Sequence, residues 1–360
     1  MDDIAAASTG VTPQREIPFE FRATGGEYFR IWIVNLLLSI VTIGIYSAWA
    51  KVRRLRYFYG STSLDGASFE YHGRPIQILK GRLIAFAGYL LLVIPGRFYP
   101  LLNLLLFPLI VFGIPWVIMR SRAFQLRMTS WRGLRFKFHG TYGGAMGAYI
   151  GWVLLSIVSL GILWPVAVWK RVNYLLANSA YGTQRFTFVT TKGVFYAFCI
   201  IAVLLLIAVG CVSAVVFGSL AGLLSSSGAA DPRVALTVFL KSGGFLVVAG
   251  AGALFLVVAA YFQKSLLNAS FGGVVIGPHR LVSRLRTGPL AWIFITNLLA
   301  MVCTLGLFYP WAKVRQARYQ LANMALLTEG DLDRFTAAAG VGVDAIGEEI
   351  GDFFDIDFGL

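Results

Sequence analysis

The pentapeptide WAKVR occurs twice in this chain, at residues 49–53 and 311–315, and each copy occupies the same place in a longer pattern. A glycine lies five residues before the tryptophan, and a tyrosine lies thirteen residues after that glycine. A degenerate middle copy keeps the glycine and the tyrosine but has no tryptophan at that position. The glycine and tyrosine pairs are Gly44 and Tyr57, Gly161 and Tyr174, and Gly306 and Tyr319. This self-similarity predicts a fold built from three internal repeats.

The repeats lie in a strongly apolar chain. Hydrophobic residues make up 58% of the 360 residues, and the mean hydropathy is +0.73. A soluble core of this size could not bury so much apolar surface, which predicts a multi-pass membrane protein. The first ten residues lack a basic region that leads into an apolar stretch, so we expect insertion through the first apolar segment.

Charge is distributed unevenly along the chain. Residues 1–327 hold 30 Lys and Arg against eight acids, whereas residues 328–360 hold nine acids against one basic residue. The basic residues cluster beside apolar segments, and this placement favours membrane topology over nucleic-acid binding. We therefore expect the lipid bilayer and its anionic headgroups as partners and no nucleic acid. The acidic tail, 328–360, is a possible docking segment for a protein partner.

Seven apolar stretches allow two topologies. The stretches lie near 29–50, 81–96, 99–119, 147–169, 194–218, 243–262 and 288–312. Either all seven cross the membrane, or four cross it while the three repeats enter and return. The second topology leaves only Arg97, Arg233 and Lys241 outside, in better agreement with the positive-inside tendency, and it places the C-terminus in the cytoplasm.

Local sequence supports a break within each repeat. Glycine at the three repeat positions suits a helix C-terminus, and Pro165 and Pro310 suit the first turn of a following helix. A first helix over 28–43 would be about 24 Å long, short of the ~30 Å hydrocarbon core. A basic, aromatic second helix over 46–60 is then expected along the cytoplasmic interface.

Short alternating runs with flanking glycines predict strands between the apolar segments, at 19–21, 68–71, 136–138 and 185–188. Pairing of 19–21 with 69–71 would place both ends of the first repeat on one side of the membrane. The predicted fold class is mainly α: a polytopic membrane protein with three internal repeats and short β-strands flanking them at the cytoplasmic face. We predict five segments along the chain. They are a disordered N-terminus (1–16), the first repeat with its following span (17–98), a span with the second repeat, the next span and an external loop (99–240), a span with the truncated third repeat (241–327), and an acidic cytoplasmic tail (328–360).

The repeated motif supplies the candidate binding residues, which are Trp49, Lys51, Arg53, Trp311, Lys313 and Arg315. They could form a cationic rim that binds an anionic headgroup or solute, since arginine chelates phosphate with two donors. Alternatively, they anchor each repeat at the interface. Asn35 and Asn297 occupy equivalent intramembrane positions and could bond each other, line a polar pathway or serve helix packing.

Other chemistry is sparse in the sequence. We find no motif for a hydrolase, a phosphate-binding loop or a proton relay, so no catalytic residue and no cofactor is predicted. His72, His139 and His279 lie beside glycine or proline at strand ends without an acid or cysteine cluster, and no metal site is predicted.

The segments FEFRATGGEYFRIW, GIYSAWAKVRRLRYFYGST and ASFEYHGRPIQILKGRLIA resemble the YjgN family of bacterial inner-membrane proteins over about residues 17–327. The resemblance implies an inner-membrane location and supplies no reaction. Repeats, discontinuous segments and intramembrane Asn favour transport or lipid handling. A non-transporting scaffold that binds anionic lipid or a protein through its basic face and acidic tail is the alternative.

Overall fold

The computed structural model describes residues 14–226, 237 and 244–341, and its strands close into a single antiparallel barrel. The strands are β1 (Arg15–Phe21), β2 (Thr62–Leu64), β3 (Ala67–Tyr71), β4 (Thr129–Trp131), β5 (Leu134–Phe138), β6 (Ser179–Tyr181), β7 (Gln184–Phe188), β8 (Val274–Ile276), β9 (His279–Ser283) and β10 (Met324–Thr328). Each strand pairs with its neighbours in sequence, and β10 pairs with β1 to close the ring.

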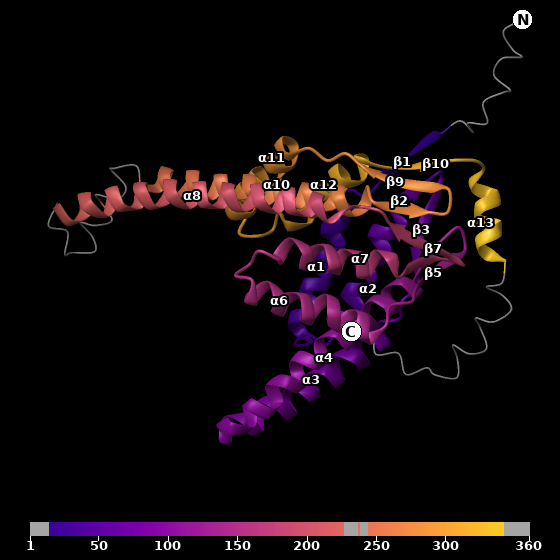
Figure 1. Ribbon diagram of the computed structural model, residues 1–360, viewed down its shortest axis with the longest axis horizontal. Helices are drawn as coiled ribbons and strands as arrows, with labels where there is room; N and C mark the ends of the chain where they lie inside the picture. The colour runs from indigo at the N-terminus through magenta and orange to yellow at the C-terminus, as the bar shows by residue number, and fades with distance from the viewer. Residues whose placement is uncertain (1–13, 227–236, 238–243, 342–360) are drawn as a thin grey trace, which may run out of the picture.

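Helices leave the barrel on one side and return to it as hairpins (Figure 1). They are α1 (Gly25–Val41), α2 (Ser47–Gly60), α3 (Pro75–Phe98), α4 (Pro100–Arg127), α5 (Tyr142–Met146), the π-helical turn η2 (Gly147–Gly151), α6 (Trp152–Val158), α7 (Trp164–Ala177), α8 (Lys192–Ser226), α10 (Gly244–Phe271), α11 (Thr287–Cys303) and α12 (Tyr309–Ala322). The five hairpins start after β1, β3, β5, β7 and β9, and each returns to the next strand along the barrel.

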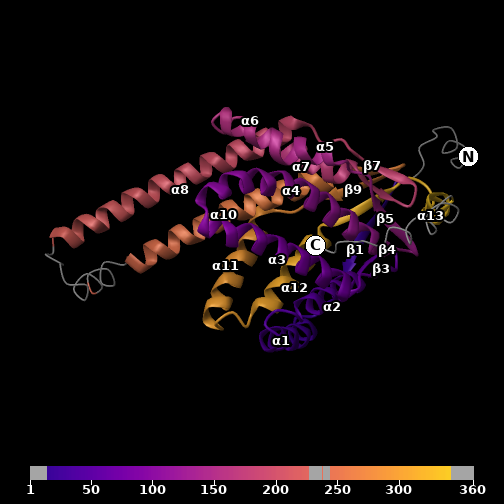
Figure 2. The same cartoon turned by 90° about the horizontal axis from the view of Figure 1, so that it is seen from below.

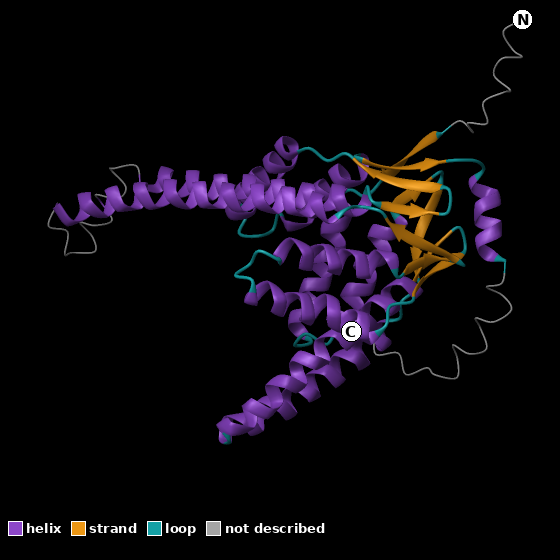
Figure 3. Cartoon of the chain, viewed as in Figure 1, coloured by secondary structure: helices purple, strands orange, loops and turns teal. Residues whose placement is uncertain are grey.

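The described chain therefore repeats one β-α-α-β unit five times. The first, third and fifth units have short helical hairpins, and the second and fourth have long ones. The predicted mainly α fold class is wrong, because the alternating segments form a closed ten-stranded barrel (Figure 3). Each short strand bonds to both neighbours, and closure leaves no open edge. The predicted pairing of 19–21 with 69–71 is also wrong. Residues Phe19–Phe21 pair with β2 instead, whereas Phe69–Tyr71 pair with β4.

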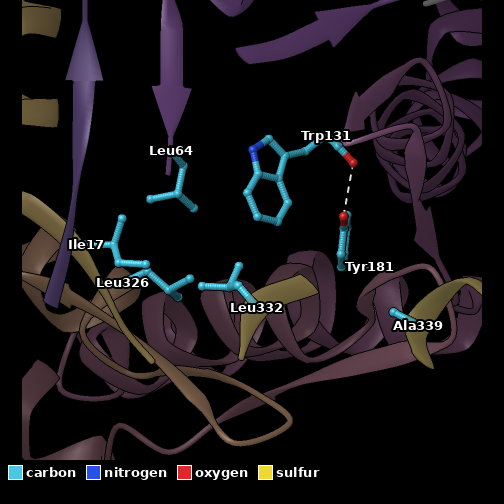
Figure 4. Close-up of a cluster of buried hydrophobic side chains, with 7 residues drawn as sticks. All are labelled: Ile17, Leu64, Trp131, Tyr181, Leu326, Leu332 and Ala339. Atoms are coloured by element: carbon cyan, nitrogen blue, oxygen red, sulfur yellow. Dashed lines mark hydrogen bonds between the residues drawn. The ribbon is translucent and has the colours of Figure 1, made fainter. Parts of the chain in front are cut away.

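Large apolar side chains fill the barrel, so its interior is a packed core. Ile17, Leu64, Trp131, Tyr181 and Leu326 are buried together there, and the Tyr181 hydroxyl donates a 3.0 Å hydrogen bond to the Trp131 carbonyl (Figure 4). Burial raises the pKa of Tyr181 to about 12, so the phenol keeps the proton that it donates.

A short C-terminal helix, α13 (Leu332–Gly340), covers the mouth of the barrel on the side opposite the other helices (Figure 1). Leu332 and Ala339 belong to the buried barrel core, and Phe335 packs against it. Arg132, at the β4–β5 turn, pairs with Asp65 at 2.6 Å and with Asp333 of α13 at 2.5 Å. The predicted tail from 328 thus contributes the end of β10 and this helix, and residues 342–360 lie outside the described residues.

The helices also pack in a ring. Within each hairpin the two helices contact each other, and between hairpins α2 contacts α3, α4 contacts α5, α7 contacts α8, α10 contacts α11 and α12 contacts α1. The last contact brings together the two ends of the chain's helical region, and Figure 2 shows α11, α12, α1 and α2 as one group. The repeats with the two WAKVR copies are therefore spatial neighbours.

Four helical segments are long and apolar enough to cross a membrane, and they belong to the two long hairpins. They are Pro75–Pro95, Leu106–Arg127, Lys192–Val215 and Val248–Phe271. The three short hairpins begin with 17-residue apolar segments, each about 26 Å long, below the ~30 Å of a hydrocarbon core. These lengths agree with four crossing helices and three shorter hairpins rather than with seven spans.

The three short hairpins turn in the same way. Ile43, Leu160 and Leu305 adopt φ near +50° and are followed by Gly44, Gly161 and Gly306 at φ near +88°. Each glycine N–H donates to the carbonyl five residues earlier at 2.7 Å, as in a Schellman motif. The hydroxyls of Thr42, Ser159 and Thr304 accept from the backbone N–H of the residue just before the second helix at 3.0–3.1 Å.

These turns are suited to hydrocarbon. Their backbone donors are paired within the turn, as a segment inside a bilayer requires. The apolar side chain at each tip is almost fully exposed: 94% for Ile43, 93% for Leu160 and 94% for Leu305. The glycine and proline break predicted from sequence is confirmed, because Pro165 and Pro310 lie in the first turns of α7 and α12.

Candidate functional site

The repeated tyrosine fastens each short hairpin at its base. The hydroxyls of Tyr57, Tyr174 and Tyr319 donate to the carbonyls of Thr24, Thr141 and Arg286 at 3.0–3.1 Å. Each acceptor residue immediately precedes the first helix of the same hairpin. The tyrosine that recurs in the sequence thus joins the end of one helix to the start of the other.

Trp311 lies at the junction between the last hairpin and the first. Its ring packs against Gly25, where a Cβ would collide with the indole, and it lies 4.8 Å from the Phe29 ring. On the other side it stacks on Phe308 at 5.9 Å. Because a glycine is needed beneath the indole, this tryptophan locks α12 against α1.

Trp49 does not share a pocket with Trp311. It stacks on Tyr46 at 6.0 Å and packs beside the cluster of Ala48, Val52 and Ile78, between α2 and α3. The two WAKVR copies therefore occupy equivalent positions at different junctions.

The two intramembrane asparagines do not bond each other. Asn297 donates to the Ala312 carbonyl and accepts from Arg315, both at 3.4 Å, and Arg315 also donates to Thr296 at 2.7 Å. These partners tie α11 to α12. Asn35 is buried at the equivalent position of α1, and none of the described residues donates a hydrogen bond to its carbonyl oxygen.

Lys51 belongs to a group of cations between α2 and α3. Burial lowers the pKa of Lys51, and the neighbouring charges of Arg82 and Arg54 lower it further. The Arg82 guanidinium donates to the Ser47 hydroxyl. Three like charges at one helix junction favour a bound anion.

Cations recur at one level of the helical layer. Arg53, Arg120, Lys170 and Arg315 each lie nine residues before the following strand begins, and Lys264 lies ten residues before β8. At about 1.5 Å per residue, these positions are ~14 Å from the barrel. We call these five residues the cationic belt; it includes one residue from every hairpin.

The helical layer offers the belt almost no acidic partner. Between residues 72 and 328 the sequence has 23 Lys and Arg but one acid, Asp231, which lies outside the described residues. Cations in this layer must therefore find anions that the layer itself does not supply. This imbalance is visible in the sequence. Two members of the belt, Arg53 and Arg315, were predicted from the WAKVR copies. The other three members and Arg82 lie outside those copies, so the repeat did not indicate them.

A shallow groove of about 420 Å³ lies between α8 and α10, next to the barrel. Its wall includes apolar residues such as Val194, Phe198 and Ile201 together with Lys264 and Asn268. The Lys264 ammonium lies 5.4 Å from the Tyr261 ring centroid. An apolar wall beside a cation suits an amphiphile with an anionic head.

The histidines are separate from one another. His72 lies 2.7 Å from the Ser130 hydroxyl and 3.4 Å from the Glu70 carboxylate, on the outside of the barrel. His279 is buried against Phe335 of α13, with ring centroids 4.4 Å apart. Among the described residues, no group of three His, Cys, Asp or Glu could hold a metal ion.

Comparison with known proteins identifies the family of this chain. The family described as "Bacterial protein of unknown function (DUF898)" matches residues 16–353. The protein named inner membrane protein YjgN from Salmonella typhimurium is 26% identical over 362 residues, which cover 87% of this chain and 88% of the relative. YjgN from Escherichia coli is also 26% identical, with 88% and 89% covered. No solved structure matches the chain.

Proposed function

This chain belongs to the DUF898 family of bacterial proteins, and from that premise we propose that it handles anionic lipid at the cytoplasmic face of the inner membrane. Its relatives are inner-membrane proteins, and four of its helical segments are long and apolar enough to cross the bilayer. The protein is thus a multi-pass inner-membrane protein. What it does there must come from the chemistry of its membrane-facing layer.

The distribution of charge supports a cytoplasmic barrel. Among the described basic residues of the long hairpins, Arg97 at the end of α3 lies farthest along its helix from the barrel. Most other cations of the described residues lie in the barrel strands or within ten residues of one, and cations accumulate on the cytoplasmic side of inner-membrane proteins. In this orientation the three short hairpins enter the cytoplasmic leaflet tip first, and the C-terminus is cytoplasmic.

The observation that carries the proposal is the belt of cations in a helical layer whose described residues include a single acid, Glu27. In the proposed orientation the belt lies near the headgroups of the cytoplasmic leaflet, where anionic lipids supply the missing negative charge. Lys51, Arg53, Lys313 and Arg315 belong to the same layer. Their proposed role is to hold headgroups, while Trp49 and Trp311 fix the junctions between hairpins.

Lipid handling is favoured over passage of a solute through the barrel. Aromatic side chains fill the barrel, and α13 covers its outer mouth. The membrane side instead offers surfaces open to lipid: three apolar hairpin tips and the groove between α8 and α10. Both features suit a molecule that approaches sideways from the bilayer.

Lipid retention tests the proposal directly. The full chain is extracted in native membrane discs, and its lipids are compared by mass spectrometry with those of an unrelated multi-pass protein. We expect enrichment of anionic phospholipid, reduced when Lys51, Arg53, Lys313 and Arg315 become Gln. The matched control replaces Arg135, Lys137, Arg185 and Arg280, which are cations of the barrel strands, and should retain the enrichment. Equal lipid composition in wild type and the unrelated protein would contradict the proposal.

A membrane scaffold is the second candidate. Its support is the position of α13, which fixes the start of the acidic C-terminal segment at the barrel mouth that faces away from the helices. An acidic segment presented there would be accessible to a cytoplasmic protein. Retention of bulk lipid only, together with loss of a co-purified protein on deletion of residues 342–360, would favour this role.

A further inference from the structure

We propose that Arg122, Tyr149 and Arg171 form a binding site for a phosphate group at the junction of the second and third hairpins. The inference deepens the proposed function and rests on it for the expectation that the phosphate belongs to a lipid headgroup. A free phosphate has the same chemistry, and the experiment below separates the two sources.

Three elements bring these residues together. Arg122 lies near the end of α4, Arg171 lies in the middle of α7, and Tyr149 lies in the π-helical turn η2, which contacts both helices. The Arg171 guanidinium carbon is 5.5 Å from the Tyr149 ring centroid, and Tyr149 is within electrostatic range of both arginines. Both guanidinium groups are thus close enough to the phenol for their charges to act on it.

Hydrogen-bond donors of both arginines lack acceptors. The Nε atoms of Arg122 and Arg171 are buried, and no described residue accepts a hydrogen bond from either atom. A buried donor without an acceptor is costly, and such groups often mark the place of an ion or water. Two buried donors of this kind near one phenol indicate that an acceptor belongs beside them.

Aromatic contacts do not remove this need. Arg171 also lies over the Trp164 ring at 5.4 Å, a cation–π contact that acts through the face of the guanidinium. The Nε–H group points along the plane of the guanidinium and still requires an acceptor. The aromatic rings therefore hold Arg171 in place while its donors stay available.

A π-helical turn carries the tyrosine of this site. A single π turn inside an α-helix shifts the side chains beside it and often occurs at functional sites. A Cβ added at Gly147, the first residue of the turn, would meet no atom within 4 Å, so this glycine does not serve close helix packing.

The ligand class follows from the donors and their surroundings. Arginine binds phosphate through two parallel hydrogen bonds, and a tyrosine hydroxyl adds one more donor. Arg122 and Arg171 lie seven and eight residues before the following strands, close to the level of the cationic belt. In the proposed orientation this is the headgroup level, where phospholipid phosphates are the most abundant anions.

The test measures anionic lipid that remains bound to the full chain. Protein is reconstituted in discs of equimolar phosphatidylcholine and phosphatidylglycerol, released and examined by native mass spectrometry. Replacement of both Arg122 and Arg171 by Gln should reduce retention of one phosphatidylglycerol about tenfold or more. The matched control replaces Arg74 and Lys192, cations at the start of α3 and of α8 that lie outside the cationic belt, and should keep it.

A second measurement identifies the source of the phosphate. Inorganic phosphate and phosphatidylglycerol are added separately to wild type in neutral detergent, and the thermal midpoint is recorded. Stabilisation by phosphatidylglycerol alone supports a lipid site. If inorganic phosphate stabilises wild type but not the Gln pair, the result supports a phosphate site and removes its lipid role. This conclusion also holds when the discs show no enrichment of anionic lipid.

Two results would overturn the site. The first is equal loss of lipid in the Gln pair and in the matched control, which would leave bulk charge as the cause and the proposed function intact. The second is unchanged retention and unchanged stabilisation in the Gln pair. Should that pair fail to fold, Arg171→Lys keeps the charge but lacks the Nε donor, and it must then weaken retention relative to Lys170→Arg.

Discussion

The hydroxyl of Tyr57 accepts a 2.9 Å hydrogen bond from the Thr24 N–H and donates to the Thr24 carbonyl, across 33 residues of chain. Tyr319 makes the same pair of bonds with Arg286, again 33 residues away. One side chain therefore satisfies both backbone groups at the position where α1 or α11 leaves the barrel. The bond fixes the angle between hairpin and barrel.

Removing this hydroxyl should loosen the first hairpin. We expect Tyr57→Phe to lower the free energy of unfolding by about 1 kcal/mol, because the Thr24 backbone groups lose their partner while the ring remains. Denaturant titration of the protein in mixed micelles measures the change. Tyr46→Phe is the control, since no hydrogen bond of its hydroxyl is seen in the structure, and an equal loss in both variants would contradict the role of Tyr57.

The exposed tips of the short hairpins should lie in lipid. Cysteine at Ile43, Leu160 or Leu305 can carry a bimane label, and brominated phospholipid quenches bimane on contact. We expect strong quenching at these three positions because nearly the whole side chain is exposed and apolar. Lys137→Cys, on a barrel strand, should show none; quenching equal to this control would place the tips in water.

Much of the helical region could be predicted from the sequence because its signals are local. Glycine and proline specify the hairpin turns through backbone conformation, and apolar length separates four crossing segments from three shorter ones. The recurring tyrosine was identified as a repeat position without its role. That role depends on a hydrogen bond between residues 33 positions apart, which no local pattern reveals.

The barrel could not be predicted in the same way. Its strands are three to seven residues long, and each pairs with partners contributed from beyond a helical hairpin. Only three repeats were visible, because the long hairpins have Phe124 and Ala269 where the short ones have tyrosine. Equivalence of the five units appears only in the order of the strands.

Phe335 should hold α13 on the barrel. Its ring centroid lies 4.4 Å from that of His279 and 6.3 Å from that of Tyr181, at the edge of the apolar core. We expect Phe335→Ala to release the helix, because truncation of a packed aromatic side chain costs about 3 kcal/mol, more than a nine-residue helix can recover alone. A nitroxide at Ala338, an exposed position, should become mobile in this variant and stay immobile in the control Arg334→Ala.

Acid should release the same helix through His279. Burial lowers the pKa of His279 from its ordinary value of 6.5, and Glu329 opposes this shift only in part. His279 therefore binds a proton more readily when α13 has left the barrel than when α13 covers it. The state with α13 on the barrel loses stability as the pH falls below 6.5 towards the lowered pKa of buried His279. The contact of α13 is fully stable above that window. We expect the Ala338 nitroxide to gain mobility between pH 7.5 and 5.5, with no such gain in His279→Phe, which cannot titrate. A pH response that persists in His279→Phe would assign the effect to another group.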